Sequence, residues 1–265
     1  MLRRNVRTES AGGAHVFPGG AVDPQDADAV AWCDGLDDVR ASAALGLESG
    51  GLAYWVAAVR ECFEEAGLLF ARSRPAGPLL GHDDAELSAR LAAHRQALNA
   101  HQRALCDVCA AEGIVLALDR VHYFAHWITP KEAPRRYDTR FFVAAAPEGQ
   151  TPAHDAGEMV ADDWMRPADA LEAHRAGKIV LILPTIRNLQ ALERFATVAE
   201  ALDAAARLED VPTIEPRVAM GEEGMTLLLP GDPGYDEAGS GGAAGMAGAR
   251  FDAAARLASR RANEP

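Results

Sequence analysis

Between residues 52 and 69, apolar positions recur every three or four residues, as they do along the buried face of an α-helix. These positions are Trp55, Val56, Val59, Cys62, Phe63 and Ala66. Gly67 follows them, and glycine readily takes the left-handed conformation that ends many helices. The pattern predicts an amphipathic helix that stops near Gly67.

Strand patterns stand on either side of this helix. Residues 12–16 form a short apolar stretch that runs into the turn Phe17-Pro18-Gly19-Gly20. Residues 121–128 and 140–144 are rich in aromatic and β-branched side chains, and Pro130 and a polar stretch separate them. These last two segments are expected to pair as neighbouring strands.

The remaining chain reads mostly as helix and loop. Residues 21–50 predict an irregular or partly helical insertion, and residues 84–112 predict two helices or one bent helix. After them we expect a short strand at 159–164, a helix at 167–176 and a helix from Pro184 to about Leu208. Residues 238–265 are mostly Gly, Ala, Arg and Asp and predict a mobile tail. Strands mixed with helices predict an α/β protein.

Composition and charge narrow the class of protein. Apolar residues make up 49% of the 265 positions, without an uninterrupted apolar run of about 18 residues. The first residues lack the apolar stretch of a secretory signal, so a cytoplasmic protein without a membrane segment is expected. The net charge of -13 disfavours extended nucleic acid as a partner, whereas bound cations would still permit a small phosphorylated substrate.

The four cysteines do not predict a disulfide framework. Cys106 and Cys109 form a C-x-x-C pair with His101 nearby, but a four-ligand zinc site requires a second pair that the sequence lacks. Two small thiols buried by a helix are the simpler interpretation of this pair.

Residues 60–68 carry the candidate chemistry. Glu61, Glu64 and Glu65 lie at positions i, i+3 and i+4, which places three carboxylates on one face of the predicted helix. Their mutual repulsion raises their pKa values and favours bound cations, and magnesium prefers oxygen ligands. Arg60 can hold the Glu64 carboxylate four residues on. A solvated acidic helix face is the alternative.

Together with the upstream Phe17-Pro18-Gly19-Gly20 turn, this segment resembles the Nudix hydrolase family. The Nudix box reads G-x5-E-x7-R-E-U-x-E-E-x-G-U, where U is apolar. The positions that match it are Gly20, Arg60, Glu61, Glu64, Glu65, Gly67 and Leu68. Asp26 stands in place of the first glutamate, and 33 residues separate it from Arg60 where the usual box has seven.

Such an enlarged box is typical of the branch of the family that resembles the peroxisomal coenzyme A diphosphatase. The segments 13–20, 127–130, 134–142 and 183–185 are similar to that branch as well. The resemblance implies a Nudix-type α/β/α sandwich with a mixed sheet over residues 1–230, with insertions at about 27–52 and 80–113 and a flexible tail at 231–265. It also implies that about one and a half strands before Met1 are missing. If the chain is the whole polypeptide, its sheet would have an unpaired internal position, which would weaken folding and favour association into a homodimer.

The resemblance further implies a magnesium site, with manganese as a substitute, held by Glu61, Glu64, Glu65 and the Gly19 carbonyl. Arg60, Glu64 and Glu65 would act in catalysis. Glu158 is the candidate general base on a loop, and a plain surface glutamate is the alternative. The reaction would be attack by metal-polarised water on a phosphoanhydride bond, without a covalent intermediate.

Five residues are candidates for binding the substrate. Arg135 or Arg136 could clamp a diphosphate, and the other could pair with an acid such as Asp138. Tyr137 or Phe17 could stack on a base, or belong to the core. Arg4, followed by Gly13, lies where Nudix enzymes acting on coenzyme A carry a short signature, although Glu9 departs from it.

The leading hypothesis is therefore hydrolysis of a nucleoside diphosphate linked to another group, with coenzyme A or its acyl esters first. NADH, ADP-ribose and dinucleotides are the alternative substrates. A nucleotide-binding Nudix sensor would be expected to lose box glutamates, and all three are present here. Messenger RNA decapping would require a basic path for the RNA, against which the acidic balance argues.

Overall fold

The chain forms two compact units. The first comprises Met1–Tyr123, Phe142–Met165 and Thr197–Glu209, and the second comprises Phe124–Phe141, Arg166–Ala196 and the chain from Asp210 onward. The computed structural model describes residues 1–6, 12–81, 84–155, 157, 159–221 and 224–238. The two units are described separately below.

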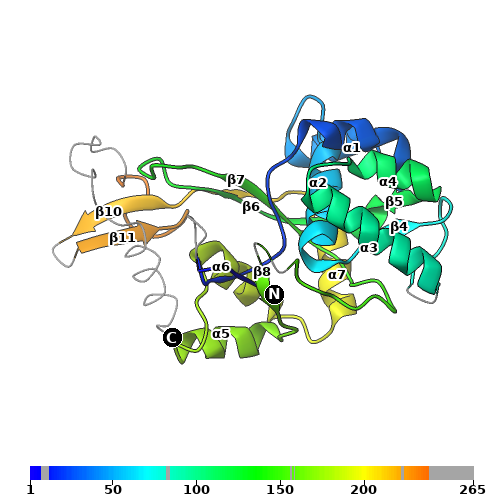
Figure 1. Ribbon diagram of the computed structural model, residues 1–265. Coiled ribbons are helices and arrows are strands. Elements are labelled where there is room, and N and C mark those ends of the chain that lie inside the picture. The colour runs from blue at the N-terminus through cyan, green and yellow to red at the C-terminus, as the bar shows by residue number, and fades with distance from the viewer. Residues whose placement is uncertain (7–11, 82–83, 156, 158, 222–223, 239–265) are drawn as a thin grey trace. The chain divides into compact units, whose positions relative to one another are not determined.

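Helices make up much of the first unit (Figure 1). They are η1 (Pro24–Trp32), α1 (Asp38–Leu45), α2 (Leu52–Ala66), α3 (Ala85–Asn99), α4 (Leu105–Glu112), η2 (Leu118–Arg120) and α7 (Val198–Ala206), where η marks a 3-10 helix. The second unit contains α5 (Pro167–Arg175) and α6 (Leu183–Leu192). Within the described ranges, no helix combines the length and the apolar character needed to cross a membrane.

The strands form small sheets. Those of the first unit are β1 (Leu2–Arg4), β2 (His15–Val16), β3 (Cys33–Asp34), β4 (Ala71–Arg72), β5 (Val115–Ala117) and β8 (Met159–Asp162). Those of the second unit are β9 (Thr213–Ile214), β10 (Arg217–Gly221) and β11 (Gly224–Leu228). Two longer strands, β6 (His122–Ile128) and β7 (Asp138–Val143), have residues in both units.

Parallel and antiparallel pairs both occur among these strands. In the order β2-β1-β8, β1 pairs antiparallel with both neighbours, and Leu2 lies opposite Val16 and Asp162. In the order β3-β5-β4, β5 pairs parallel with β3 and antiparallel with β4. In the order β7-β6-β9, β6 pairs parallel with β9, and β6 and β7 are neighbours as predicted. Mixed sheets with helices confirm the α/β class.

The amphipathic helix predicted around residue 60 is α2. Its apolar face is buried. Trp55 donates from Nε1 to the Val121 carbonyl at 2.9 Å, and its ring packs edge to face with Phe142, with 4.8 Å between the ring centroids. Gly67 has a φ of 72°, and its N–H bonds to the Phe63 carbonyl. The prediction that Gly67 ends this helix is confirmed, because its left-handed conformation closes the last turn.

The first predicted insertion contains an ordered 3-10 helix. The Asp23 carboxylate accepts the Gln25 N–H, and the Asp26 carboxylate accepts the Asp23 N–H at 2.7 Å, so that the two acids form a capping box. This helix, η1, packs against α2 and α4. Asp26 is thereby carried into the interior, where it is 1% exposed.

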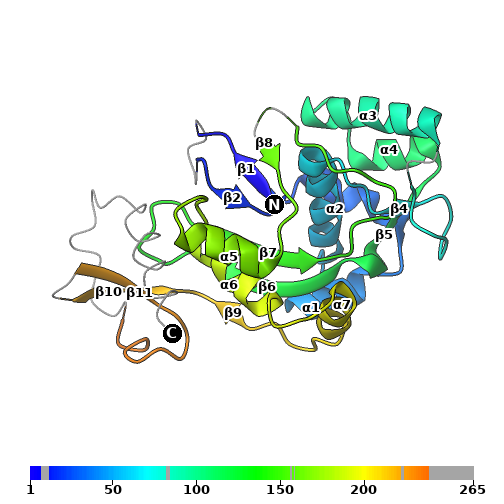
Figure 2. The ribbon, with the colours of Figure 1, turned by 90° about the horizontal axis from the view of Figure 1, so that it is seen from below.

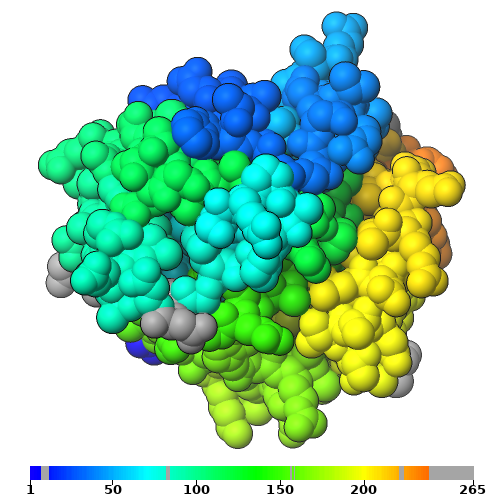
Figure 3. All heavy atoms as spheres, turned by 90° about the vertical axis from the view of Figure 1, so that its right-hand side faces the viewer, coloured from blue at the N-terminus to red at the C-terminus, as the bar shows by residue number. Residues whose placement is uncertain are grey.

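The second predicted insertion forms two helices, α3 and α4, which lie side by side (Figure 2), and α3 packs against α2. The chain turns between them at His101, whose φ is 53°. Cys109 on α4 is fully buried, and burial raises the pKa of its thiol to about 12. Leu91 and Leu98 are the buried residues of α3. The helix otherwise lies on the surface of the first unit, which Figure 3 shows from this side.

The core of the second unit is built on β6. Ala125, Trp127 and Leu183 are buried together, and Phe141, Ile214 and Leu227 are among the side chains packed on them. Beside this core, His126 Nε2 lies 2.5 Å from Asp138 Oδ1, and His126 Nδ1 lies 2.8 Å from the Thr213 hydroxyl. One histidine therefore links side chains from β6, β7 and β9.

Three sequence interpretations need correction or completion. The single helix predicted from Pro184 to Leu208 is wrong: α6 ends at Leu192 and α7 begins at Val198, because Thr197 caps a new helix by accepting the Glu200 N–H. The hairpin of β10 and β11 lies in a stretch that the sequence left unassigned. The predicted tail lies outside the described residues from 239 onward.

We predict that Leu116→Ala lowers the free energy of unfolding of the first unit by about 2–5 kcal/mol, because Leu116 is fully buried on the central strand β5. Urea denaturation measures the change. Leu208→Ala is the matched control, since Leu208 is 46% exposed and its truncation should cost no more than about 0.5 kcal/mol. Equal effects of the two substitutions would contradict this assignment of the core.

A second prediction concerns acid stability. Burial acts to raise the pKa of Asp138, but hydrogen bonds from His126 and Arg140 outweigh it and lower the pKa below its ordinary value. The unfolded chain has a pKa of about 3.9, so the ionised carboxylate stabilises the fold above that pH, and the contribution is lost as the pH falls through the lower folded value.

Asp138→Asn should therefore lower the melting temperature at about pH 7, and its difference from the wild type should shrink toward about pH 3. Asp236→Asn, at a side chain that is 94% exposed, is the control and should change little. A difference for Asp138→Asn that does not depend on pH would contradict the prediction.

Candidate active site

The Phe-Pro-Gly-Gly turn lies against the last two turns of α2. The Gly19 N–H donates to the Glu65 carboxylate at 2.9 Å, and Glu65 is 6% exposed. A Cβ atom on Gly20 would lie 2.4 Å from Glu61 Oε1, which is closer than atoms can approach. A side chain at position 20 would therefore displace the Glu61 carboxylate from the place it has beside the turn.

Arg60 is the centre of the polar cluster on α2. Its Nε and Nη2 atoms donate to the two Asp26 oxygens at 2.8 and 3.0 Å, in a bidentate pair. Its Nη1 atom donates to Glu61 at 2.7 Å and to Glu64 at 3.2 Å, and its Nη2 atom also reaches the Ala21 carbonyl at 2.8 Å. These bonds match the five N–H groups of a guanidinium, so its position is fully determined.

The charges in this cluster are not balanced. Burial acts to lower the pKa of Arg60, but its hydrogen bond to Asp26 and the charges of Asp26 and Glu61 raise the pKa above its ordinary value. Three carboxylates share this one cation. Burial, with a contribution from Glu61, raises the pKa of Glu64 in spite of Arg60. The cluster has an excess of acids, which favours a further cation.

The residue types fit a divalent metal ion. The available donors are carboxylate oxygens, which suit hard divalent cations rather than ions that prefer thiolates. Glu61 and Glu64 meet at one nitrogen of Arg60, and Glu65 faces the Gly19 N–H. Among the described residues, no three acidic, histidine or cysteine side chains already form a cage for an ion. A metal held by Glu61 and Glu64 would therefore compete with Arg60 for their oxygens.

The sequence did not reveal the role of Asp26. By position it replaces the first glutamate of the box, but in the structure it is the buried counterion of Arg60. The spacing of Asp23 and Asp26 was a usable signal, because two acids three residues apart are typical of a helix start. The contact across 34 positions to Arg60 appears only in the tertiary structure.

The inserted helix α3 also reaches this site, which the sequence analysis did not anticipate. Arg95 Nε and Asn99 Nδ2 donate to the main-chain carbonyl of Glu64 at 3.0 and 3.3 Å. The second insertion therefore contacts the helix that carries the candidate metal ligands.

Comparison with known proteins agrees with this geometry. The family model described as the NUDT19 Nudix domain matches residues 48–192, which is more than half of the chain. The chain belongs to the Nudix hydrolase family. The α/β Nudix fold and the hydrolase class predicted from the sequence are thereby confirmed, and enzymes of this family generally use divalent metals.

Individual relatives of this Nudix hydrolase cover most of its length. It is similar to the acyl-coenzyme A diphosphatase NUDT19 of Homo sapiens, with 29% identity over 89% of this chain and 72% of the relative. The protein of the same name from Gallus gallus is 28% identical, with the same coverage. The crystal structure of a NUDIX hydrolase from Alicyclobacillus acidocaldarius aligns with a TM-score of 0.56 and 26% identity, covering 76% of this chain and 86% of that one.

The remaining candidates of the first unit lie near its N-terminus or outside the described residues. Arg4 is in β1, where its N–H donates to the Ala14 carbonyl and its own carbonyl accepts the Gly13 N–H. Phe17 is half-buried in the turn. Glu158, the candidate general base, lies outside the described residues. Substrate binding by Arg4 and Phe17 stays a prediction.

In the second unit, Arg136 donates to the Thr129 carbonyl at 3.0 Å and to Glu215 at 2.7 Å. This contact agrees with the alternative that one of the two arginines pairs with an acid. Arg135 is exposed, and Tyr137 is 46% exposed rather than in the core. The roles of Arg135, Arg136 and Tyr137 in substrate binding stay predictions.

We predict that Asp26→Asn destabilises the first unit by roughly 2 kcal/mol, because an amide replaces the carboxylate that accepts two bonds from Arg60, while Glu61 and Glu64 still balance the charge of Arg60. The measurement is the denaturant midpoint. Asp28→Asn is the matched control on the same 3-10 helix, since Asp28 is exposed. A loss as small as that of Asp28→Asn would show that Asp26 does not hold Arg60.

Proposed function

We propose that this Nudix hydrolase cleaves the phosphoanhydride bond of coenzyme A or acyl-coenzyme A with magnesium as its cofactor and manganese as a possible substitute. The products would be phosphopantetheine, or its acyl ester, and adenosine 3',5'-bisphosphate. The observation that carries the proposal is the meeting of Glu61 and Glu64 at Arg60, beside Glu65 and the glycine turn. The printed names of the relatives support the choice of substrate.

In this proposal the acidic residues hold divalent cations, and the fold places these residues close enough together to do so. Glu61, Glu64, Glu65 and the Gly19 carbonyl would bind divalent cations, which polarise the attacking water and neutralise charge on the phosphate oxygens. Arg60, fully hydrogen-bonded to its neighbours, would keep Glu61 and Glu64 in register on α2. The water proton would pass to a carboxylate, for which Glu64 and Glu158 are the candidates.

The net charge favours a small nucleotide over a long polyanion, and the relatives favour coenzyme A among the small nucleotides. The net charge of -13 opposes a long polyanion, which no single metal site could compensate. Arg4 and Gly13, which match two positions of the coenzyme A signature, are joined by the bond between the Gly13 N–H and the Arg4 carbonyl. Because this main-chain bond does not depend on the side chains, the preference for coenzyme A over NADH, ADP-ribose or dinucleotides rests on the names of the relatives.

The test is product analysis after incubation with magnesium and a panel of coenzyme A, acyl-coenzyme A, NADH, ADP-ribose and diadenosine polyphosphates. We predict release of adenosine 3',5'-bisphosphate from the coenzyme A substrates, and a fall in kcat of about 100-fold or more in Glu64→Gln, because the variant loses a charged metal ligand. Glu48→Gln changes an exposed glutamate and should leave the rate unchanged.

Each outcome has a definite meaning. Faster cleavage of NADH or ADP-ribose would contradict the substrate class but keep the metal-dependent mechanism. Equal rates for Glu64→Gln and the wild type would contradict the assignment of the site itself.

A further inference from the structure

The carbonyl groups at the C-terminal end of α2 accept hydrogen bonds from residues outside the helix. The last carbonyls of any α-helix lack partners within the helix and must find them elsewhere. Here the Phe63 carbonyl accepts the Gly67 N–H at 3.0 Å, and the Ala66 carbonyl accepts the Ala153 N–H at 2.9 Å. The Glu64 carbonyl, which belongs to a candidate metal ligand, accepts its bonds from the inserted helix α3.

Arg95 of α3 makes the shorter of these bonds, and its guanidinium has a second partner. Nε donates to the Glu64 carbonyl at 3.0 Å, while Nη2 donates to the Ala153 carbonyl at 2.6 Å. Since the Ala153 N–H itself bonds to Ala66, the arginine, the helix end and the loop form a closed ring of hydrogen bonds. A single lysine ammonium lacks the planar fork that spans both carbonyls in this way.

Space and the helix dipole at the C-terminal end of α2 suit this guanidinium. A Cβ on Gly67 would lie 3.0 Å from Arg95 Nη1, so the glycine that ends α2 also leaves room for the arginine. A cation at a helix C-terminus interacts favourably with the helix dipole. Burial lowers the pKa of Arg95, although the neighbouring Asp155 acts to raise it.

We propose that Arg95 is a positioning residue of the metal site, which it supports through the main chain of Glu64. It holds the last turn of α2 in one place, and Glu64 and Glu65 both stand on that turn. The proposal rests on the function proposed above. It assigns to the second insertion a direct part in the geometry of the site, in addition to covering the first unit.

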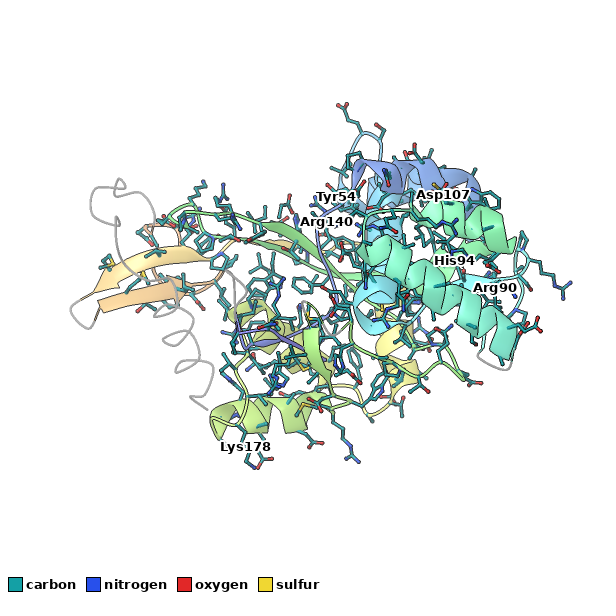
Figure 4. The ribbon with its side chains drawn as sticks, in the orientation of Figure 1. Tyr54, Arg90, His94, Asp107, Arg140 and Lys178 are labelled. Atoms are coloured by element: carbon teal, nitrogen blue, oxygen red, sulfur yellow. The ribbon has the colours of Figure 1, made fainter. Side chains whose placement is uncertain are left out.

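A purely structural role for α3 is the alternative, and the helix provides a control for it. Arg90 lies on the same helix, and Figure 4 shows it with His94. It bonds to Glu112 of α4 at 2.9 Å, as His94 does at 2.8 Å. Arg90→Met therefore disturbs the packing of the two inserted helices while leaving both bonds to Glu64 in place.

The experiment compares Arg95→Met, Arg95→Lys and Arg90→Met in the full chain. Free Mn²⁺ is followed by electron paramagnetic resonance during a titration, and kcat and KM are measured with acyl-coenzyme A. We expect Arg95→Met to raise the Mn²⁺ dissociation constant and lower kcat by about tenfold each, because groups that hydrogen-bond to a metal-binding residue orient its ligand atoms. KM should change by less than about twofold, and Arg95→Lys should lie between Arg95→Met and the wild type.

Two results would overturn the proposal. One is Mn²⁺ binding by folded Arg95→Met that equals the wild type, and the other is an equal loss in Arg90→Met and Arg95→Met. If Arg95→Met does not fold, Asn99→Ala, which removes the longer bond to the same carbonyl, must shift Mn²⁺ binding in the same direction by a smaller factor.

Glu64→Gln separates this inference from the proposed function. Equal Mn²⁺ binding by the wild type and Glu64→Gln would show that the metal site itself is wrong. A difference between those two proteins, together with wild-type binding by Arg95→Met, would contradict the role of Arg95 alone.

Discussion

The first unit depends on one buried guanidinium. Arg60 uses its N–H groups to join η1, the turn after Gly20 and two carboxylates of α2. A buried charge is tolerated only when it is paired and hydrogen-bonded, so each of these segments has to arrive at the right place for the cluster to form. The same pairing leaves more acids than bases around Arg60, and this excess of negative charge favours a bound cation there.

Two segments outside α2 complete its hydrogen bonding. The 3-10 helix η1, which holds the first acidic position of the box and continues into the first insertion, supplies Asp26, and Asp26 neutralises Arg60. The second insertion supplies Arg95, which bonds to the main chain at the C-terminal end of α2. The second insertion, an addition to the shorter box, is therefore part of the hydrogen bonding of α2. Removing it would take the bonds of Arg95 and Asn99 from the Glu64 carbonyl, which is costly.

The second unit uses a similar principle on a smaller scale. His126 joins three strands through Asp138 and Thr213, and Arg140 adds a bond to Asp138 at 2.6 Å. These contacts come from residues that lie up to 87 positions apart in the chain. As around Arg60, side chains rather than strand pairing alone hold short strands together, because strands of two to seven residues offer few main-chain bonds.

Local rules made much of this protein predictable. The spacing of apolar residues determined α2, the glycine determined its end, and the pairing of β6 with β7 followed from similar patterns. At residues 84–112 the pattern left two helices or one bent helix open, and the structure has the two helices α3 and α4. The arrangement of Arg60, Glu61 and Glu64 also followed from helical geometry, since these residues are neighbours on one helix. Thr197 is also a local signal, since threonine often caps the start of a helix, but the single predicted helix runs across it.

The tertiary structure decided which distant groups complete these local elements. Asp26 reaches Arg60 across 34 positions, and Arg95 reaches the Glu64 carbonyl across 31. The sequence does not distinguish an exposed arginine from a buried one. It also does not distinguish an acid that caps a helix from one that neutralises a cation. Their roles depend on burial and on which unsatisfied carbonyl or charge lies nearby, and both are set only when separate segments pack together.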